Sequence, residues 1–171
     1  MTTSHLDALA STPAFTEREF RNALGQFATG VTVITTVDAQ GQPVGMTVSS
    51  FNSVSLEPAL VLWSLGNNVG AYPVFAQCSH YVIHVLAEHQ KALALQFSQR
   101  GIDRFAGVEW QANAQGVPVI AGALATFECQ VHSRHAAGDH LIMVGQVLAC
   151  QHHTEAAPLL YHGGQLRGTS A

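Results

Sequence analysis

The segment GMTVSSFNSVSLEPALVLWSL, residues 45–65, decides the fold class. Apolar and small polar residues alternate through its first part, Glu57-Pro58 interrupts it, and a second apolar run follows at once. Alternation of this kind on both sides of a turn signal is typical of paired antiparallel strands. The segment therefore predicts neighbouring β-strands joined by short turns.

Strand patterns continue on both sides of this segment. A β-branched run, VTVITTV, precedes it at 31–37, and HYVIHVLA follows at 80–87. Two longer β runs are LATFECQVHS at 124–133 and HLIMVGQVLACQHH at 140–153. About six or seven strands with short turns, and no repeating strand–helix–strand unit, predict a mainly β protein, a β-barrel with flanking helices.

Two helices are expected beside the barrel. Thr16-Glu17-Arg18-Glu19 is a capping box, and apolar residues at helical spacing follow it as far as Phe27. The second helix is expected at 88–100, with a short helix or turn within 67–78. Residues 1–15 lack periodicity and are expected to form a flexible arm, and 16–171 a single domain.

The low charge content excludes several classes of function. Only 11% of the residues are charged, and the formal charge is −4, so the chain lacks the basic stripe that nucleic-acid binding needs. No apolar run is long enough to span a membrane, and the N-terminus does not resemble a signal peptide. We expect a cytoplasmic protein that covers part of its apolar surface by forming a homodimer.

Cysteine and histidine spacing does not predict a metal site. Cys78, Cys129 and Cys150 are widely separated and form no CxxC pair, so we expect reduced, buried thiols. In a strand, His132 and His135 point to opposite faces, and no cysteine or carboxylate stands at ligand spacing beside them.

Two polar clusters are candidates for ligand binding. The first lies within Thr47–Ser55, which is rich in hydroxyls and falls in a stretch without lysine or arginine between Arg21 and Lys91. Hydroxyls and backbone N–H groups at a strand end can bind a phosphate or a polar ring edge. The second cluster, Gly138-Asp139-His140, can orient an imidazole toward a ligand. A serine-rich turn and an ordinary hairpin turn are the alternative interpretations.

The order of several motifs resembles a known family. FRNALGQFATGVTVITT, GMTVSSFNSVSLEPALVLWSL, CSHYVIHVLAEHQKALALQFS, DRFAGVEW, GDHLIMVGQV and PLLYHGG follow one another along the chain. Together they resemble the short-chain flavin reductases with the FMN-binding split barrel, from about Phe20 to Gly164. The resemblance implies a homodimeric six-stranded Greek-key barrel that binds flavin at its edge, near the dimer interface.

The resemblance also implies roles for particular residues. His140 would orient NADH or NADPH, with Gly138 and Asp139 forming its turn. Arg100 and Arg104 are the nearest cations in sequence for a phosphate, and ordinary surface arginines are the alternative. The residues expected to contact FMN or FAD are Thr47, Val48, Ser49, Ser50, Ser53, Val54, Ser55, Ser64, Leu65, Asn67, Asn68 and Arg100.

The expected activity follows from the resemblance. An NAD(P)H:flavin oxidoreductase needs two stacked rings for hydride transfer and no obligatory general acid or base, which agrees with the low charge content. Its partner would be a flavin-dependent oxygenase that receives reduced flavin by diffusion. Two alternatives remain: a flavoprotein with retained flavin that reduces a ferric complex or cobalamin, and a non-catalytic flavin- or haem-binding barrel.

Overall fold

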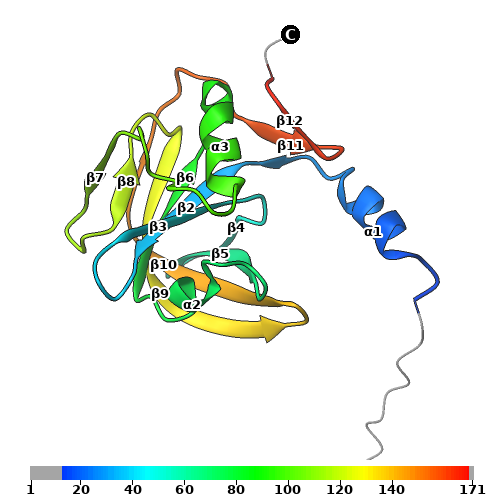
Figure 1. Ribbon diagram of the computed structural model, residues 1–171, viewed down its shortest axis with the longest axis horizontal. Coiled ribbons are helices and arrows are strands. Elements are labelled where there is room, and N and C mark those ends of the chain that lie inside the picture. The colour runs from blue at the N-terminus through cyan, green and yellow to red at the C-terminus, as the bar shows by residue number, and fades with distance from the viewer. Residues whose placement is uncertain (1–12, 170–171) are drawn as a thin grey trace, which may run out of the picture.

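A curled seven-stranded antiparallel sheet forms the body of the protein (Figure 1), which is described from a computed structural model for residues 13–169. The order of strands across the sheet is β3-β2-β6-β9-β10-β5-β4. This arrangement confirms the prediction of a mainly β protein. The strands span β2 Thr32–Val37, β3 Pro43–Val48, β4 Asn52–Leu56, β5 Ala59–Gly66, β6 His80–Val85, β9 Ala125–Ala137 and β10 His140–His152.

The two edge strands of this sheet are joined by only three residues. β3 ends at Val48 and β4 begins at Asn52, yet the two strands stand at opposite ends of the strand order. A connection of residues 49–51 reaches at most roughly 14 Å between its flanking Cα atoms. The sheet must therefore curl until its two edges approach each other. We call residues 48–51 the seam.

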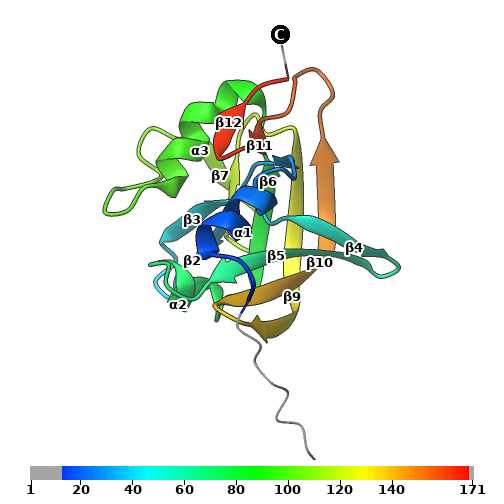
Figure 2. The same cartoon turned by 90° about the vertical axis from the view of Figure 1, so that its right-hand side faces the viewer.

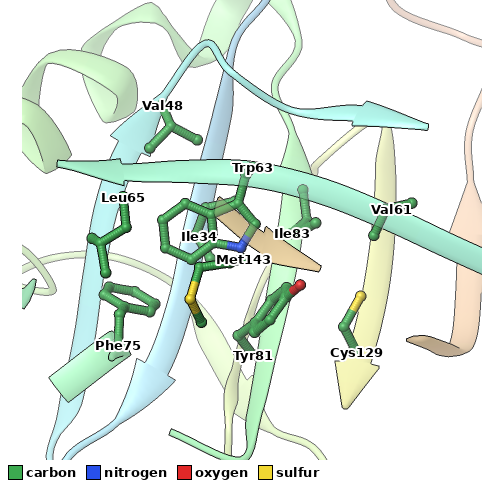
Figure 3. Close-up of a cluster of buried hydrophobic side chains, with 10 residues drawn as sticks. All are labelled: Ile34, Val48, Val61, Trp63, Leu65, Phe75, Tyr81, Ile83, Cys129 and Met143. Carbon is green, nitrogen blue, oxygen red and sulfur yellow. The ribbon is translucent and has the colours of Figure 1, made fainter. Parts of the chain in front are cut away.

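The interior of the curled sheet holds one apolar core (Figure 3). Trp63 stands edge-on to both Phe75 and Tyr81, with ring centroids 5.2 and 5.8 Å away. A Cβ atom at Gly145 would collide with the Tyr81 hydroxyl, so the glycine in β10 leaves room for this ring. Large rings at the centre fix the diameter of the barrel and the place where the seam lies.

Helices and small sheets flank the barrel (Figures 1 and 2). A second apolar cluster, which includes Val33, Leu86 and Phe97, packs α3 against β2 and β3. The helices are α1 Glu17–Leu24, α2 Tyr72–Phe75 and α3 Lys91–Ser98, preceded by a 3₁₀ turn at Glu88–Gln90. The remaining strands are β1 Thr29–Gly30, β7 Trp110–Ala112, β8 Pro118–Ile120, β11 Leu160–His162 and β12 Gln165–Arg167.

A buried histidine joins the barrel to β8. His84 lies in β6 with no exposed surface, and its Nδ1 is 3.0 Å from the Val33 carbonyl oxygen. The Ile120 backbone N–H donates to His84 Nε2 over 3.0 Å. This geometry requires the neutral tautomer with the proton on Nδ1. Accordingly, burial lowers the pKa of His84 to about 4.

The helix α1 stands apart from the barrel (Figure 1) and exposes its apolar side chains. The predicted capping box is present, with reciprocal bonds between Thr16 and Glu19. None of the residues of α1 is buried. Phe20, Leu24 and Phe27 are all about half exposed or more, as are Val54 and Leu56 in the β4–β5 hairpin. Packing within one chain therefore leaves these apolar side chains uncovered.

The predictions on cysteine burial, on the N-terminal arm and on membrane helices can be compared with the structure. Cys129 is buried and Cys78 partly buried, but Cys150 is exposed, on the part of β10 that pairs with β9 and lies beyond the residues paired with β5, so its predicted burial was wrong. Residues 1–12 of the predicted arm lie outside the described residues. Within 13–169, no helix is long and apolar enough to cross a membrane. A cytoplasmic location stays a prediction.

Candidate functional site

A cavity of about 480 Å³ lies at the seam, between the end of β3, α3 and the β11–β12 hairpin. Its size is in the range of small-molecule sites, and most of its lining is apolar. Of the predicted flavin contacts, three line it: Thr47, Val48 and Ser49. The other lining residues are Val31, Lys91, Ala94, Leu95, Ser98, Tyr161, Gly164, Gln165 and Leu166.

Hydroxyls at the seam hold the walls of this cavity together. The Thr47 hydroxyl donates to the Ala94 carbonyl oxygen over 2.7 Å and so ties β3 to α3. Across the seam, the Ser64 backbone N–H donates to the Ser50 hydroxyl over 2.9 Å. The sequence suggests Thr47 and Ser50 as flavin contacts; in the structure both hydroxyls bond to the protein's own backbone, and their contact with flavin stays a prediction. Ser49 is exposed and lines the cavity.

The remaining serines of the predicted loop lie elsewhere. Ser53, Val54 and Ser55 belong to β4, which runs away from the cavity in the projecting β4–β5 hairpin (Figure 2). The Ser55 hydroxyl accepts the Glu57 N–H over 3.2 Å within that hairpin. In this single chain these three residues are not among those that line the seam cavity, so their role in flavin binding stays a prediction.

A narrower cavity of about 160 Å³ continues from the seam cavity. The two share Thr47 and Ser98 in their linings, and the second also reaches Gly70, Arg100 and Arg104. Together they form a trough that runs from the β11–β12 hairpin toward a pair of guanidinium groups. Anions bind well to such groups, because guanidinium N–H donors match phosphate oxygens.

The two arginines have different roles. Arg104 donates to the Gly45 carbonyl oxygen over 2.7 Å and twice to the Gln99 carbonyl oxygen, at 2.8 and 2.5 Å. Burial and, to a smaller extent, the charge of Arg100 lower the pKa of Arg104. Within residues 13–169 Arg100 has no carboxylate at ion-pair distance. Arg104 thus shapes the loop, and Arg100 is the cation available to an anion.

The Gly138-Asp139-His140 motif forms the tip of the β9–β10 hairpin. Gly138 has φ +60°, which glycine adopts without strain, so β9 and β10 are joined by only two residues. His140 Nδ1 lies 2.7 Å from an Asp139 carboxylate oxygen, and this bond holds the pKa of Asp139 below its usual range. The neutral imidazole therefore presents Nε2 as an acceptor, and a donor role there requires protonation.

Strand pairing brings the tip of this hairpin to the end of β5. His140 pairs with Gly66, and the Asn67 N–H donates to the Asp139 carbonyl oxygen over 2.9 Å. A Cβ atom at Gly66 would lie 3.6 Å from His140 Nε2 and 3.5 Å from the Asn68 side-chain oxygen. Leu65 is fully buried in the core, so only its backbone can meet a ligand. Asn68 and Ser64 stay candidates.

Sequence reasoning missed the far wall of the seam cavity. Tyr161, Gln165 and Leu166 come from the C-terminal hairpin, and β1 pairs with this hairpin through Thr29 and Tyr161. Lys91, Leu95 and Ser98 come from α3. No local signal marks these residues, because long-range pairing alone brings them to the seam.

Comparison with known proteins identifies the family. The model of the flavin reductase like domain matches residues 24–170, which is most of the chain. The chain belongs to the flavin reductase family. The resemblance noted in the sequence is thus confirmed.

Relatives in this family act with flavin and NADH. The chain is 49% identical over 147 residues to the FMN reductase (NADH) SmoA of Agrobacterium fabrum, covering 86% of this chain and 83% of the relative. It is 38% identical over 162 residues to the reductase subunit HsaB of a flavin-dependent monooxygenase from Rhodococcus jostii. That alignment covers 95% of this chain and 83% of the relative. The similarity to these two reductases therefore covers most of this chain.

A solved structure agrees in fold. The NADH:FAD oxidoreductase SgcE6 of Streptomyces globisporus, in complex with NAD and FAD fragments, superposes with a TM-score of 0.83 at 35% identity, covering 88% of this chain and 90% of that one. The residues of this chain fit a flavin. The seam cavity is mostly apolar, as a flat ring system requires, and Arg100 stands where the trough could receive a phosphate.

Proposed function

We propose that this protein is an NAD(P)H:flavin oxidoreductase that binds FMN or FAD in the trough along β3 and NADH or NADPH beside His140. The observation that carries the proposal is the junction of three features at one edge of the barrel: the apolar seam cavity, Arg100, which has no carboxylate at ion-pair distance among residues 13–169, and the His140–Asp139 pair next to Gly66. The family membership agrees with it.

The residues of this chain act by placing two ring systems. A bound flavin supplies the two-electron chemistry, and the protein must orient the nicotinamide toward it. The Asp139 carboxylate fixes the His140 imidazole through Nδ1, so Nε2 can accept a hydrogen bond from the nicotinamide carboxamide. Thr47 holds α3 against β3 and so keeps the flavin cavity in shape. No side chain is required as a general acid or base.

Steady-state reduction tests this proposal. Purified protein is mixed with NADH or NADPH and an excess of FMN or FAD, and the absorbance of the reduced nicotinamide is followed. Loss of that absorbance with catalytic amounts of protein supports the proposal. Absence of turnover with every pair would favour a binding barrel, and turnover only with a ferric or cobalamin acceptor would favour retained flavin.

We further propose that the protein is a homodimer and supplies reduced flavin to an oxygenase. A second copy would cover the exposed apolar residues of α1 and of the β4–β5 hairpin, which single-chain packing leaves in water. Light scattering of the eluting protein should give twice the chain mass. Leu56→Glu, at a side chain 97% exposed in the single chain, should shift the protein toward the monomer, whereas Ala39→Glu on the β2–β3 turn should not.

The oxygenase partner is supported by relatives named as reductase components of flavin-dependent monooxygenases, such as HsaB. Delivery by free diffusion predicts that a flavin-dependent monooxygenase separated from this protein by a dialysis membrane still turns over. Turnover only when the two proteins are mixed would instead indicate direct transfer.

A further inference from the structure

The trough does not end at the arginines. A third cavity of about 540 Å³ extends it along β3 as far as Pro43, and it shares Gly70, Ala71, Arg100 and Arg104 with the narrow cavity. The three cavities thus follow one strand in sequence order, from Val48 at the seam to Pro43 at the far end. If a ligand places its phosphate at Arg100, the third cavity leaves space beyond that phosphate for a further group of the same ligand.

The chemistry of this third cavity changes along its length. At its inner end stand the two guanidinium groups, close enough for the charge of Arg100 to act on Arg104. Farther out it is lined by Pro43, Val44, Ile102 and Phe105. Asp103 also lines it, but one of its carboxylate oxygens accepts the Phe105 N–H over 3.0 Å. Two cations at one end and apolar side chains at the other suit a ligand with a phosphate at one end and a flat ring at the other.

We propose that this third cavity binds the adenylate half of FAD and makes FAD the preferred flavin over FMN. The inference rests on the proposed function and adds the identity of the flavin to it. The phosphate next to the ribityl chain, which FMN and FAD share, lies at Arg100, and the adenine of FAD packs on Ile102, which FMN cannot reach. Ile102 is 46% exposed in the single chain and has room for a ring against it.

An adenylate also occurs in NADH, and the geometry favours FAD. The third cavity opens from the flavin trough through residues shared with the narrow cavity. His140, the proposed nicotinamide contact, is not among the residues that line the three cavities, although Asn68, which lies beside it at Gly66, also lines the third. The nicotinamide dinucleotide therefore approaches from the β9–β10 hairpin, and the flavin occupies the trough.

Flavin binding without nicotinamide tests the inference. Dissociation constants for riboflavin, FMN and FAD are measured by quenching of flavin fluorescence. We expect FAD to bind about tenfold more tightly than FMN, the gain from burying an adenine face. Ile102→Gln, which keeps the size of the side chain and adds no charge, should abolish this preference by weakening FAD alone, and Ala39→Gln on an exposed turn should preserve it.

Other outcomes would overturn the inference. Equal dissociation constants for FMN and FAD, or an Ile102→Gln variant that weakens both flavins alike, would show that the third cavity holds no adenylate of FAD. A variant that raises the KM for NADH with FMN as acceptor, while FAD binding is unchanged, would assign the cavity to NADH. Failure of the proposed function can be distinguished from failure of this inference, because in the first case no flavin would be reduced at all.

Discussion

The Thr47 hydroxyl donates to the Ala94 carbonyl oxygen over 2.7 Å. The bond joins the seam end of β3 to the middle of α3, so the strand and the helix that form two walls of the flavin cavity are held at a fixed separation. Thr47, which the sequence suggests as a flavin contact, lines this cavity and also ties its strand to the helix on the other side.

Thr47→Val should weaken flavin binding about threefold to tenfold, because a typical hydrogen bond contributes about 1 kcal/mol and its loss lets α3 move. Thr47→Ser keeps the hydroxyl and should bind flavin as the original protein does. Fluorescence titration measures both variants. Equal binding by the valine and serine variants would contradict the role assigned to the hydroxyl.

His140→Ala should raise the KM for NADH several-fold and leave the flavin dissociation constant unchanged, because we propose that the imidazole, oriented by Asp139, contacts the nicotinamide. Asp139→Asn should give a smaller increase in the same KM, since it weakens the bond that orients the ring. Steady-state kinetics with separate flavin titrations measure both effects. Unchanged KM and turnover with NADH and NADPH would refute a positioning role for His140.

Arg100→Ala should weaken FMN and FAD by about tenfold and leave riboflavin unaffected, because the guanidinium meets a phosphate that riboflavin lacks. The dependence of FMN binding on salt should also become flatter, since an exposed cation is screened by ions. Arg18→Ala on the exposed face of α1 is the control. Equal weakening of riboflavin and FMN would instead indicate a general loss of structure.

Gly45→Ala should destabilise the protein by about 1–3 kcal/mol through overpacking. A Cβ atom there would lie 2.5 Å from a ring carbon of Phe97, which is fully buried. Gly30→Ala is the matched control, because a Cβ atom at Gly30 has no neighbour within 4 Å. Urea denaturation measures both variants, and equal midpoints for the two would contradict the close contact.

Acid should destabilise the protein through His84. Burial lowers the pKa of His84 to about 4 from the ordinary 6.5. Below pH 6.5 the imidazole therefore becomes protonated in the unfolded state, whereas in the folded state it stays neutral down to about pH 4. Stability therefore falls as the pH drops through this window, by up to about 3 kcal/mol, and is flat above it for this group.

The control for this pH dependence is His84→Gln, which lacks a titrating group. The variant is expected to be less stable at pH 8 but to lose less stability between pH 6.5 and 4. Urea midpoints measured across that range provide the comparison. A slope identical to that of the original protein would mean that other groups cause the acid sensitivity.

The sequence by itself determined the features that depend on near neighbours. The capping box at Thr16 and Glu19 was predictable because its two bonds lie within four residues, and the tight turn at Gly138 because glycine adopts a positive φ. Alternating apolar residues also predicted the strands, because their side chains must point alternately to the core and away from it.

Only the tertiary structure decided which polar groups face a ligand. Arg100 and Arg104 look alike in sequence, but the Gly45 and Gln99 carbonyl oxygens hold Arg104 and leave Arg100 available. Tyr161 reaches the seam through its pairing with Thr29, which no local pattern predicts. A hydrogen-bonding group that a distant backbone atom already engages has less capacity left for a ligand, and the folded chain alone determines which groups those are.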